Sequence, residues 1–202
     1  MLVGGLVVAT AACSDSKKDK SDADEPASTS QTTAADTTEP TETTEPVDCS
    51  VDALNLVNAG VLTVGTASPA EPPWFQDDDP TNGQGFESAV AYAVADELGF
   101  DKSEVTWATV AVDDALAPGD KAFDFDINHV SIDDARKQAV DFSESYYETT
   151  PAAAGGPADE LGLVFAKGNP LRDCVDKALG WLKESGELER IEQQWPPGAI
   201  NA

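Results

Sequence analysis

From residue 49 onward, short segments typical of strands alternate with segments typical of helices, and this alternation most constrains the fold. The expected strands are 61–67, 104–112, 124–130, 141–147 and 160–168. Helical spacing or a helix stop signal marks the segments 51–60, 87–100, 133–140, 169–186 and 187–195, whereas 113–123 is expected to be irregular. Strands that alternate with helices favour a single α/β lobe with a mostly parallel sheet flanked by helices.

The chain is strongly acidic. Against 38 Asp and Glu stand 12 Lys and Arg, which gives a formal net charge of −26. Nucleic-acid binding depends on Lys and Arg that neutralise phosphates, and docking on anionic lipid requires a basic patch. The charge therefore argues against a nucleic-acid partner and against membrane contact through charged side chains.

The first residues, MLVGGLVVATAAC, are apolar and then small, and they end at Cys13. This pattern is typical of the end of a signal peptide, and TAAC resembles a bacterial lipobox in which Thr10 replaces the commoner Leu. The stretch is too short to span a membrane, which takes about 20 apolar residues. We expect 1–13 to be a signal-peptide remnant and Cys13 to carry lipid, so that a lipid anchor holds an exported protein on the outer face of the cytoplasmic membrane. The alternative is an apolar N-terminus that arose by chance.

Residues 14–48 are rich in Ser, Thr, Asp, Glu, Ala and Pro and show no hydrophobic period. Such a segment buries too little apolar surface to offset the entropy of ordering it. We expect a disordered acidic linker that holds the domain away from the membrane.

The chain has three cysteines, Cys13, Cys49 and Cys174. If Cys13 carries lipid, Cys49 and Cys174 form an even pair, and outside the cytosol we expect them to form a disulfide. It would tie the start of the folded part to its end. The sequence has no CxxC motif and no Cys/His cluster, so neither a structural zinc site nor a cofactor is expected.

Four segments, in this order, resemble the bacterial extracellular solute-binding proteins of family 3, the amino-acid receptors of ABC importers. They are LTVGTASPAEPPWF, GFESAVAYAVADELGF, FDFDINHVSIDDARKQAVDFSESYY and GLVFAKGNPLRDCVDKALGWLKESGELERIEQQW. The resemblance covers nearly all of 49–195, and it is nearest to actinobacterial lipoproteins. It implies a periplasmic-binding-protein-like fold of type II and ABC permease subunits as partners.

Family members have two α/β lobes with a ligand cleft between them, and the chain crosses to the second lobe and returns. Here VDFSESYY resembles the outgoing crossover and GLVFAKG the return, with only ETTPAAAGGPADE, 148–160, between them. Thirteen residues span about 45 Å at most. We therefore expect 49–197 to form lobe one alone, from 49–147 and 161–197, with 148–160 as a linker that replaces lobe two.

The resemblance implies ligand-binding roles for Ser131 and Arg136. In the family, an Arg five residues after a Ser receives the α-carboxylate of the ligand. A guanidinium binds a carboxylate through two parallel hydrogen bonds, and a helix N-terminus adds backbone N–H donors. The alternative is a surface Arg136 that pairs with Asp133, Asp134 or Glu144.

Other expected pocket positions depart from the family. Glu71 stands where an aromatic residue usually stacks on the ligand, Val112 where a second aromatic often follows, and His129 where close relatives tend to have Gln. DDAR replaces the common Pro-Glu-Arg pattern. Ser68 and Trp74 complete the predicted ligand residues, although Trp74 has core packing as its alternative.

Metal binding and catalysis are weaker interpretations. Asp124 and Asp126 would lie on the opposite strand face from His129, and DDDPTNGQGFE lacks the Gly and Glu that a calcium loop requires at its sixth and twelfth positions. Glu71 and Glu87 with His129 have the chemistry for acid–base work, but no nucleophile–base pair is recognisable. No metal is therefore predicted, and the chain is not expected to be an enzyme.

Three functions remain open. The first is the substrate-binding component of an amino-acid importer, truncated, with weak or lost binding of a small amino-acid-like ligand. The second is a lobe-one remnant that serves as a scaffold or docks on a permease without binding solute. A periplasmic enzyme on the same scaffold comes last.

Overall fold

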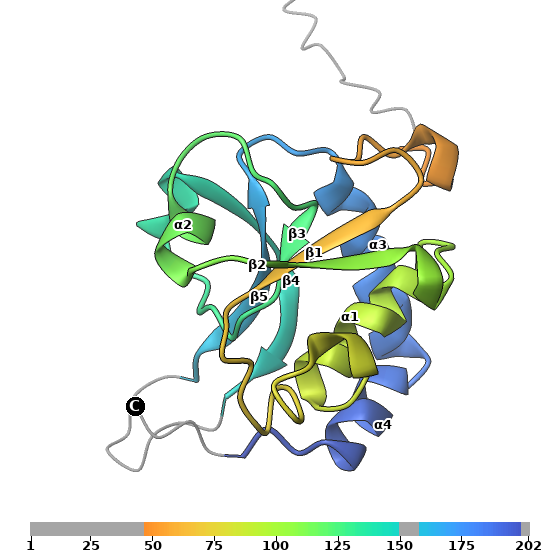
Figure 1. Ribbon diagram of the computed structural model, residues 1–202, viewed down its shortest axis with the longest axis vertical. Helices are drawn as coiled ribbons and strands as arrows, with labels where there is room; N and C mark the ends of the chain where they lie inside the picture. The colour runs from red at the N-terminus through yellow and green to blue at the C-terminus, as the bar shows by residue number, and fades with distance from the viewer. Residues whose placement is uncertain (1–46, 150–157, 199–202) are drawn as a thin grey trace, which may run out of the picture. The chain divides into compact units, whose positions relative to one another are not determined.

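The computed structural model describes residues 47–149 and 158–198. They form a five-stranded sheet in the order β2-β1-β3-β5-β4. The strands are β1 (Leu62–Thr66), β2 (Val105–Thr109), β3 (Phe125–Asp126), β4 (Val140–Glu148) and β5 (Glu160–Ala166). The expected single α/β lobe is confirmed, and helices lie on both sides of its sheet (Figure 1).

The sheet is mixed rather than mostly parallel. Strand β1 pairs in parallel with β2 and β3, whereas β5 is antiparallel to both β3 and β4. A parallel crossover needs a connection of a dozen or more residues, usually with a helix, so the short return from β4 makes β5 antiparallel to it. In the parallel half, β2-β1-β3, the crossover from β1 to β2 contains the predicted helix, whereas the helix between β2 and β3 was not predicted.

The helices form two unequal layers. Helices α1 (Phe86–Glu97), α3 (Leu171–Glu184) and α4 (Glu187–Gln194) lie together on one side of the sheet, and the short α2 (Val112–Leu116) lies on the other (Figure 1). The main core lies between the sheet and helices α1, α3 and α4. It includes Phe86, Phe125 and Phe165, which are almost inaccessible to solvent. A smaller core under α2 centres on Val130, Val140, Phe142 and Val164.

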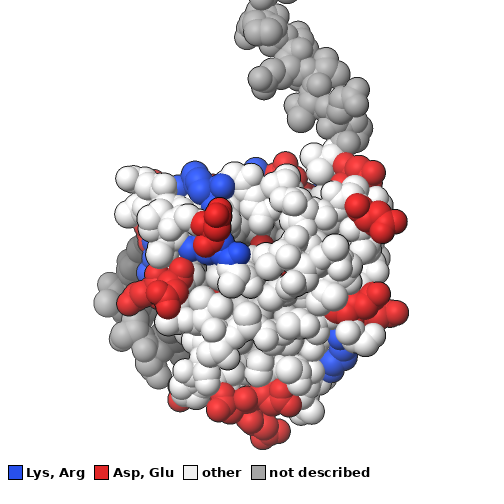
Figure 2. All heavy atoms as spheres, turned by 45° about the horizontal axis from the view of Figure 1, so that its top comes forward, with Lys and Arg blue, Asp and Glu red and all other residues white. Residues whose placement is uncertain are grey.

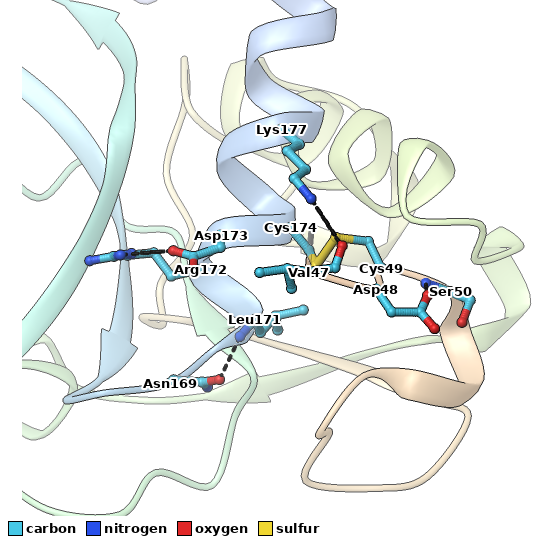
Figure 3. Close-up of a disulfide and its surroundings, with 10 residues drawn as sticks. All are labelled: Val47, Asp48, Cys49, Ser50, Asn169, Leu171, Arg172, Asp173, Cys174 and Lys177. Atoms are coloured by element: carbon cyan, nitrogen blue, oxygen red, sulfur yellow. Dashed lines mark hydrogen bonds and ion pairs between the residues drawn. A yellow bond between two sulfur atoms is a disulfide. The ribbon is translucent and has the colours of Figure 1, made fainter. Parts of the chain in front are cut away.

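A disulfide joins Cys49 to Cys174 in the first turn of α3, across a sequence separation of 125 residues. The predicted pairing is therefore confirmed. Beside it, Lys177 Nζ donates a hydrogen bond to the Val47 carbonyl oxygen at 3.0 Å (Figure 3). These contacts fix the beginning of the described chain to α3.

The predicted helix over 51–60 is wrong, because only Val51–Ala53 forms a 3-10 turn. The residues that follow leave the helical path, because the Asp124 carboxylate accepts the Val57 N–H at 2.7 Å. Asn58 then pairs with Val61 across a tight turn in which Gly60 has φ +73°. Bonds to a distant strand thus outweigh the local helical pattern.

Three other boundaries differ from expectation. The strand predicted over 124–130 is regular only at β3, because His129 adopts a left-handed φ of +42°. The helix predicted over 133–140 is a 3-10 turn, Arg136–Gln138. Helix α2 was not predicted: it begins at Val112, the last residue of the predicted strand 104–112, and continues into the segment expected to be irregular.

Several expectations fall on residues that the structure does not describe. The signal-peptide remnant 1–13 with Cys13, nearly all of the linker 14–48, and 150–157 of the connection 148–160 lie outside the described residues. Among the described helices, none is long and apolar enough to cross a membrane.

Candidate functional site

Seven predicted ligand residues follow the carboxyl ends of the three parallel strands. Ser68, Glu71 and Trp74 come after β1, and Val112 comes after β2; the residues after β3 are His129, Ser131 and Arg136. Strands β2, β1 and β3 are neighbours, so their carboxyl ends meet at one edge of the sheet. Ligands of open α/β sheets bind outside the carboxyl ends of the strands. The tertiary structure thus directs three separate segments toward one edge.

Trp74 and His129 form the clearest contact among these residues. Their rings stack with centroids 5.3 Å apart and planes inclined by 20°. Trp74 is 9% exposed, while the His129 side chain is 46% exposed. The alternative of core packing for Trp74 holds in part, because its other faces meet Phe86 and Tyr147 edge-on.

Glu87 lies beneath His129 in the first turn of α1, and its side chain is completely buried. One carboxylate oxygen accepts hydrogen bonds from the His129 backbone N–H and from the Tyr146 hydroxyl, both at 2.5 Å. The other oxygen lies 3.7 Å from His129 Nδ1. This pairing raises the pKa of the His129 imidazole, burial opposes it, and Glu71 acts in the same direction as Glu87. Glu87 was considered with His129 from the sequence, whereas Tyr146 was missed.

Asp126 is a second buried carboxyl group near Glu87. Neither of its side-chain oxygens has a hydrogen-bond partner within the described residues. Burial, followed by the negative charge of Glu87, raises the pKa of Asp126 well above its ordinary value. Its neighbour on β1 is Gly65, where a Cβ would lie 2.9 Å from an Asp126 oxygen. The unpartnered group is therefore best accommodated as a neutral acid.

Arg136 makes local bonds. Its Nη1 donates to the Ser131 carbonyl oxygen at 2.7 Å, and its Nε lies 3.1 Å from Asp133 Oδ2. The Asp133 carboxylate also accepts the Arg136 backbone N–H, which lowers the pKa of Asp133. The side chain of Arg136 remains 38% exposed. The pairing with Asp133 matches the alternative weighed from the sequence, and it leaves part of the guanidinium open to solvent.

The other predicted residues are less engaged. Ser68 and Glu71 are exposed on the loop after β1. Val112 is half-buried at the start of α2, where it packs on the smaller core. The structure thus brings Trp74 and His129 into contact and Ser131 and Arg136 into contact, while Val112 has a packing role.

No group of three or more His, Cys, Asp or Glu side chains among the described residues is arranged to hold a metal ion. The aspartates of the calcium-like stretch have local backbone roles. Asp78 accepts the Ala70 N–H at 2.7 Å, and Asp79 accepts the Thr81 N–H at 2.9 Å. These carboxylates stabilise the loop that carries Glu71 and Trp74.

Charged side chains are unevenly spread over the surface. On the face shown in Figure 2, acidic groups lie around the rim, and Lys and Arg gather mainly in one corner beside carboxylates. A groove of about 590 Å³ along β4 also combines both signs. Its Lys167 pairs with Asp141 at 2.6 Å and its Lys183 with Glu144 at 3.3 Å. Each of these two cations therefore has an acidic partner within the groove.

Known structures share this fold at low sequence identity. An ancestral cationic amino acid solute-binding protein has a TM-score of 0.56 and 19% identity, over 69% of this chain and 96% of that one. A periplasmic binding protein of Salmonella typhimurium with high arginine specificity gives 0.54 and 17%, over 68% and 99%. The arginine-, lysine- and histidine-binding protein ArtJ of Geobacillus stearothermophilus gives 0.54 and 18%, over 70% and 97%.

Among curated protein sequences, no significant match is found. Residues 62–198, however, match the family model of the bacterial extracellular solute-binding proteins, family 3. The match begins at β1, continues past the end of α4, and includes every segment that lies at the candidate site. The chain therefore belongs to the bacterial extracellular solute-binding proteins of family 3.

Proposed function

We propose that this protein is the solute-binding component of an ABC-type amino-acid importer, working without enzymatic activity. Its support is the placement of the predicted ligand residues at the carboxyl ends of β1, β2 and β3 in a chain of this family. The part-exposed guanidinium of Arg136 receives the α-carboxylate of the solute, with Ser131 beside it. Exposed Glu71 favours a solute that presents an amine to this side of the site.

The solute rests on one lobe only. Strand β4 ends at Glu148 and β5 begins at Glu160, so eleven residues of sequence, 149–159, connect them, and these are too few for a second lobe. Two-lobed binding proteins enclose their ligand by closing a hinge. A single lobe leaves the solute partly in water, so we expect weak binding, with a dissociation constant on the order of 1 mM.

Thermal unfolding with a panel of amino acids tests the proposal. A ligand at ten times a millimolar dissociation constant stabilises the folded state by about 1.4 kcal/mol, which raises the melting temperature by a few degrees. Arg136→Ala removes a charge-assisted pair and should weaken binding by about 10- to 100-fold, since such bonds contribute about 1.5–3 kcal/mol.

Arg190→Ala is the matched control. Arg190 is also a surface arginine paired with an acid three residues away, Glu187 on α4, but it lies outside the candidate site. The proposal requires a thermal shift that survives Arg190→Ala and disappears in Arg136→Ala. If no amino acid shifts the melting temperature, or if both variants respond alike, solute binding through Arg136 is refuted.

The engagement of Arg136 with Asp133 supports a second candidate function. A guanidinium already paired at 3.1 Å must give up part of that contact to bind a solute. The same lobe would then serve as a scaffold that docks on permease subunits without solute. Capture of the permease by solute-free protein, unchanged in Arg136→Ala, favours this candidate over the first.

We place the protein outside the cell, tethered to the outer face of the cytoplasmic membrane through lipid on Cys13. The lipobox-like TAAC and the acidic linker 14–48 support this placement. Cys13→Ala should release the protein from the membrane fraction into the medium. Retention of the variant on membranes that have been washed with high salt would contradict a lipid anchor as the sole attachment.

A further inference from the structure

His129 is held by contacts on both its backbone and its ring. The backbone has φ +42°, which a residue other than Gly seldom adopts. Its N–H donates to Glu87 Oε1, its Nδ1 lies 3.7 Å from Glu87 Oε2, and its ring stacks on Trp74. A half-exposed side chain in an unusual backbone conformation needs such support to stay in one place.

Glu87 ties together three segments that are distant in sequence. Its carboxylate binds the turn after β3 through His129 and binds β4 through the Tyr146 hydroxyl. Its backbone N–H donates to the Trp74 carbonyl oxygen at 2.9 Å, which fixes the loop after β1. The residue that pairs with the imidazole therefore also positions the aromatic ring under it.

Trp74 is a predicted ligand residue, and His129 covers it. The imidazole lies nearly parallel to the indole, as a solute side chain would when stacking there. On the basis of the proposed function, we propose that Glu87 positions His129 as a proton-dependent cover on Trp74. The imidazolium is held closed between Glu87 and Trp74, whereas the neutral ring is released and opens Trp74 to the solute.

The charged and titratable groups around His129 determine whether low or high pH closes the cover. Glu87 on α1 and Glu71 on the loop after β1 are the acids that act on the imidazole. Asp126 on β3 is deeply buried with a raised pKa. Burial also raises the pKa of Tyr146 on β4, which stays protonated and donates a hydrogen bond to Glu87. Acids that favour the imidazolium close the cover at low pH, and loss of the proton opens it as pH rises through the pKa of His129.

His129 is the single histidine of the chain, so its imidazole gives one unambiguous proton NMR titration in the full-length protein. Its pKa should lie above that of the urea-unfolded chain and fall in Glu87→Gln. Glu144→Gln is the control, because it removes one charge from an exposed acid on β4. An equal pKa in folded and unfolded chain, or no fall in Glu87→Gln, overturns the role of Glu87. The first comparison needs no variant, so an equal pKa overturns the role of Glu87 even if Glu87→Gln fails to fold.

Solute binding as a function of pH tests the cover itself, with the amino acid that gives the largest thermal shift. One pH unit below the pKa of His129, about a tenth of the molecules are open, so affinity should be about tenfold weaker than well above it. His129→Asn, which tolerates the left-handed backbone, should bind with equal affinity across this range. Binding that is independent of pH in the wild type overturns the cover and leaves the proposed function standing. Absence of binding at every pH, in the wild type and in His129→Asn, refutes the proposed function and, with it, the control of solute binding by His129. The NMR titration still tests whether Glu87 pairs with His129.

Discussion

Replacing both Cys49 and Cys174 with Ser removes the covalent tie between the start of the folded part and α3. The bond closes a loop with a sequence separation of 125 residues. In the chain-entropy model, opening such a loop lowers the free energy of unfolding by about 5 kcal/mol, because the unfolded chain regains its freedom. For a domain of this size, that loss lowers the melting temperature by roughly 10–20 °C.

Urea unfolding of the full chain, followed by circular dichroism, measures this loss. The wild type and the double variant both carry Cys13→Ser, so that no other disulfide forms. Because Cys174 is buried, Ser at that position adds a cost of its own. Reduced wild-type protein supplies the control, since any difference between it and the double variant reports only the substitutions.

The reasoning holds if reduction alone lowers the free energy of unfolding by several kcal/mol. A reduced wild type within about 1 kcal/mol of the oxidised protein would refute it. That result would mean that the hydrogen bond from Lys177 to Val47 and the packing of α3 keep this end in place without the covalent bond.

Three further substitutions address the buried polar groups and the tight packing under the site. Asp126→Asn should raise the free energy of unfolding by about 1–2 kcal/mol at pH 8 but hardly at pH 3. The reason is that the pKa of Asp126 is raised in the folded protein, so the wild type loses stability as pH rises through that pKa. An equal gain at both pH values would contradict this. Tyr146→Phe should lower the free energy of unfolding by about 1–3 kcal/mol in urea, since the buried Glu87 loses a donor, and a neutral effect would show that water or a rearrangement replaces it. Gly85→Ala should destabilise the protein by more than 2 kcal/mol in the same assay, because Gly85 has φ +96° and its Cβ would lie 2.5 Å from a backbone oxygen. The matched control is Gly180→Ala inside α3, where nothing lies within 4 Å, and it should stabilise the protein by about 0.5–1 kcal/mol.

Local patterns predicted the elements whose own side chains carry their stability. Helix α3 shows a marked apolar face, and its buried residues recur at helical spacing, including Leu171, Val175 and Leu179. Strand β1 lies within a predicted strand, and its five residues are all buried. The cysteine count predicted the disulfide on the condition that Cys13 carries lipid, because Cys49 and Cys174 are then the two that remain to pair.

Local patterns failed where a distant residue decides the backbone. Asp124 takes the N–H of Val57 and Thr63, so the chain around 57 turns instead of continuing a helix. His129 follows the same logic, because its left-handed backbone depends on a carboxylate 42 residues away. Neither effect leaves a periodic signal in the sequence.

By itself, the sequence determined the acidic charge, the α/β class, the cysteine pair and the family resemblance, because these depend on composition, periodicity and short motifs. The mixed pairing of the sheet, the stacking of His129 on Trp74, and the burial of Glu87 between Tyr146 and His129 depend on the fold as a whole. The physical reason is that a buried carboxylate finds its hydrogen-bond donors through the fold, from residues whose positions along the chain give no indication that they will meet.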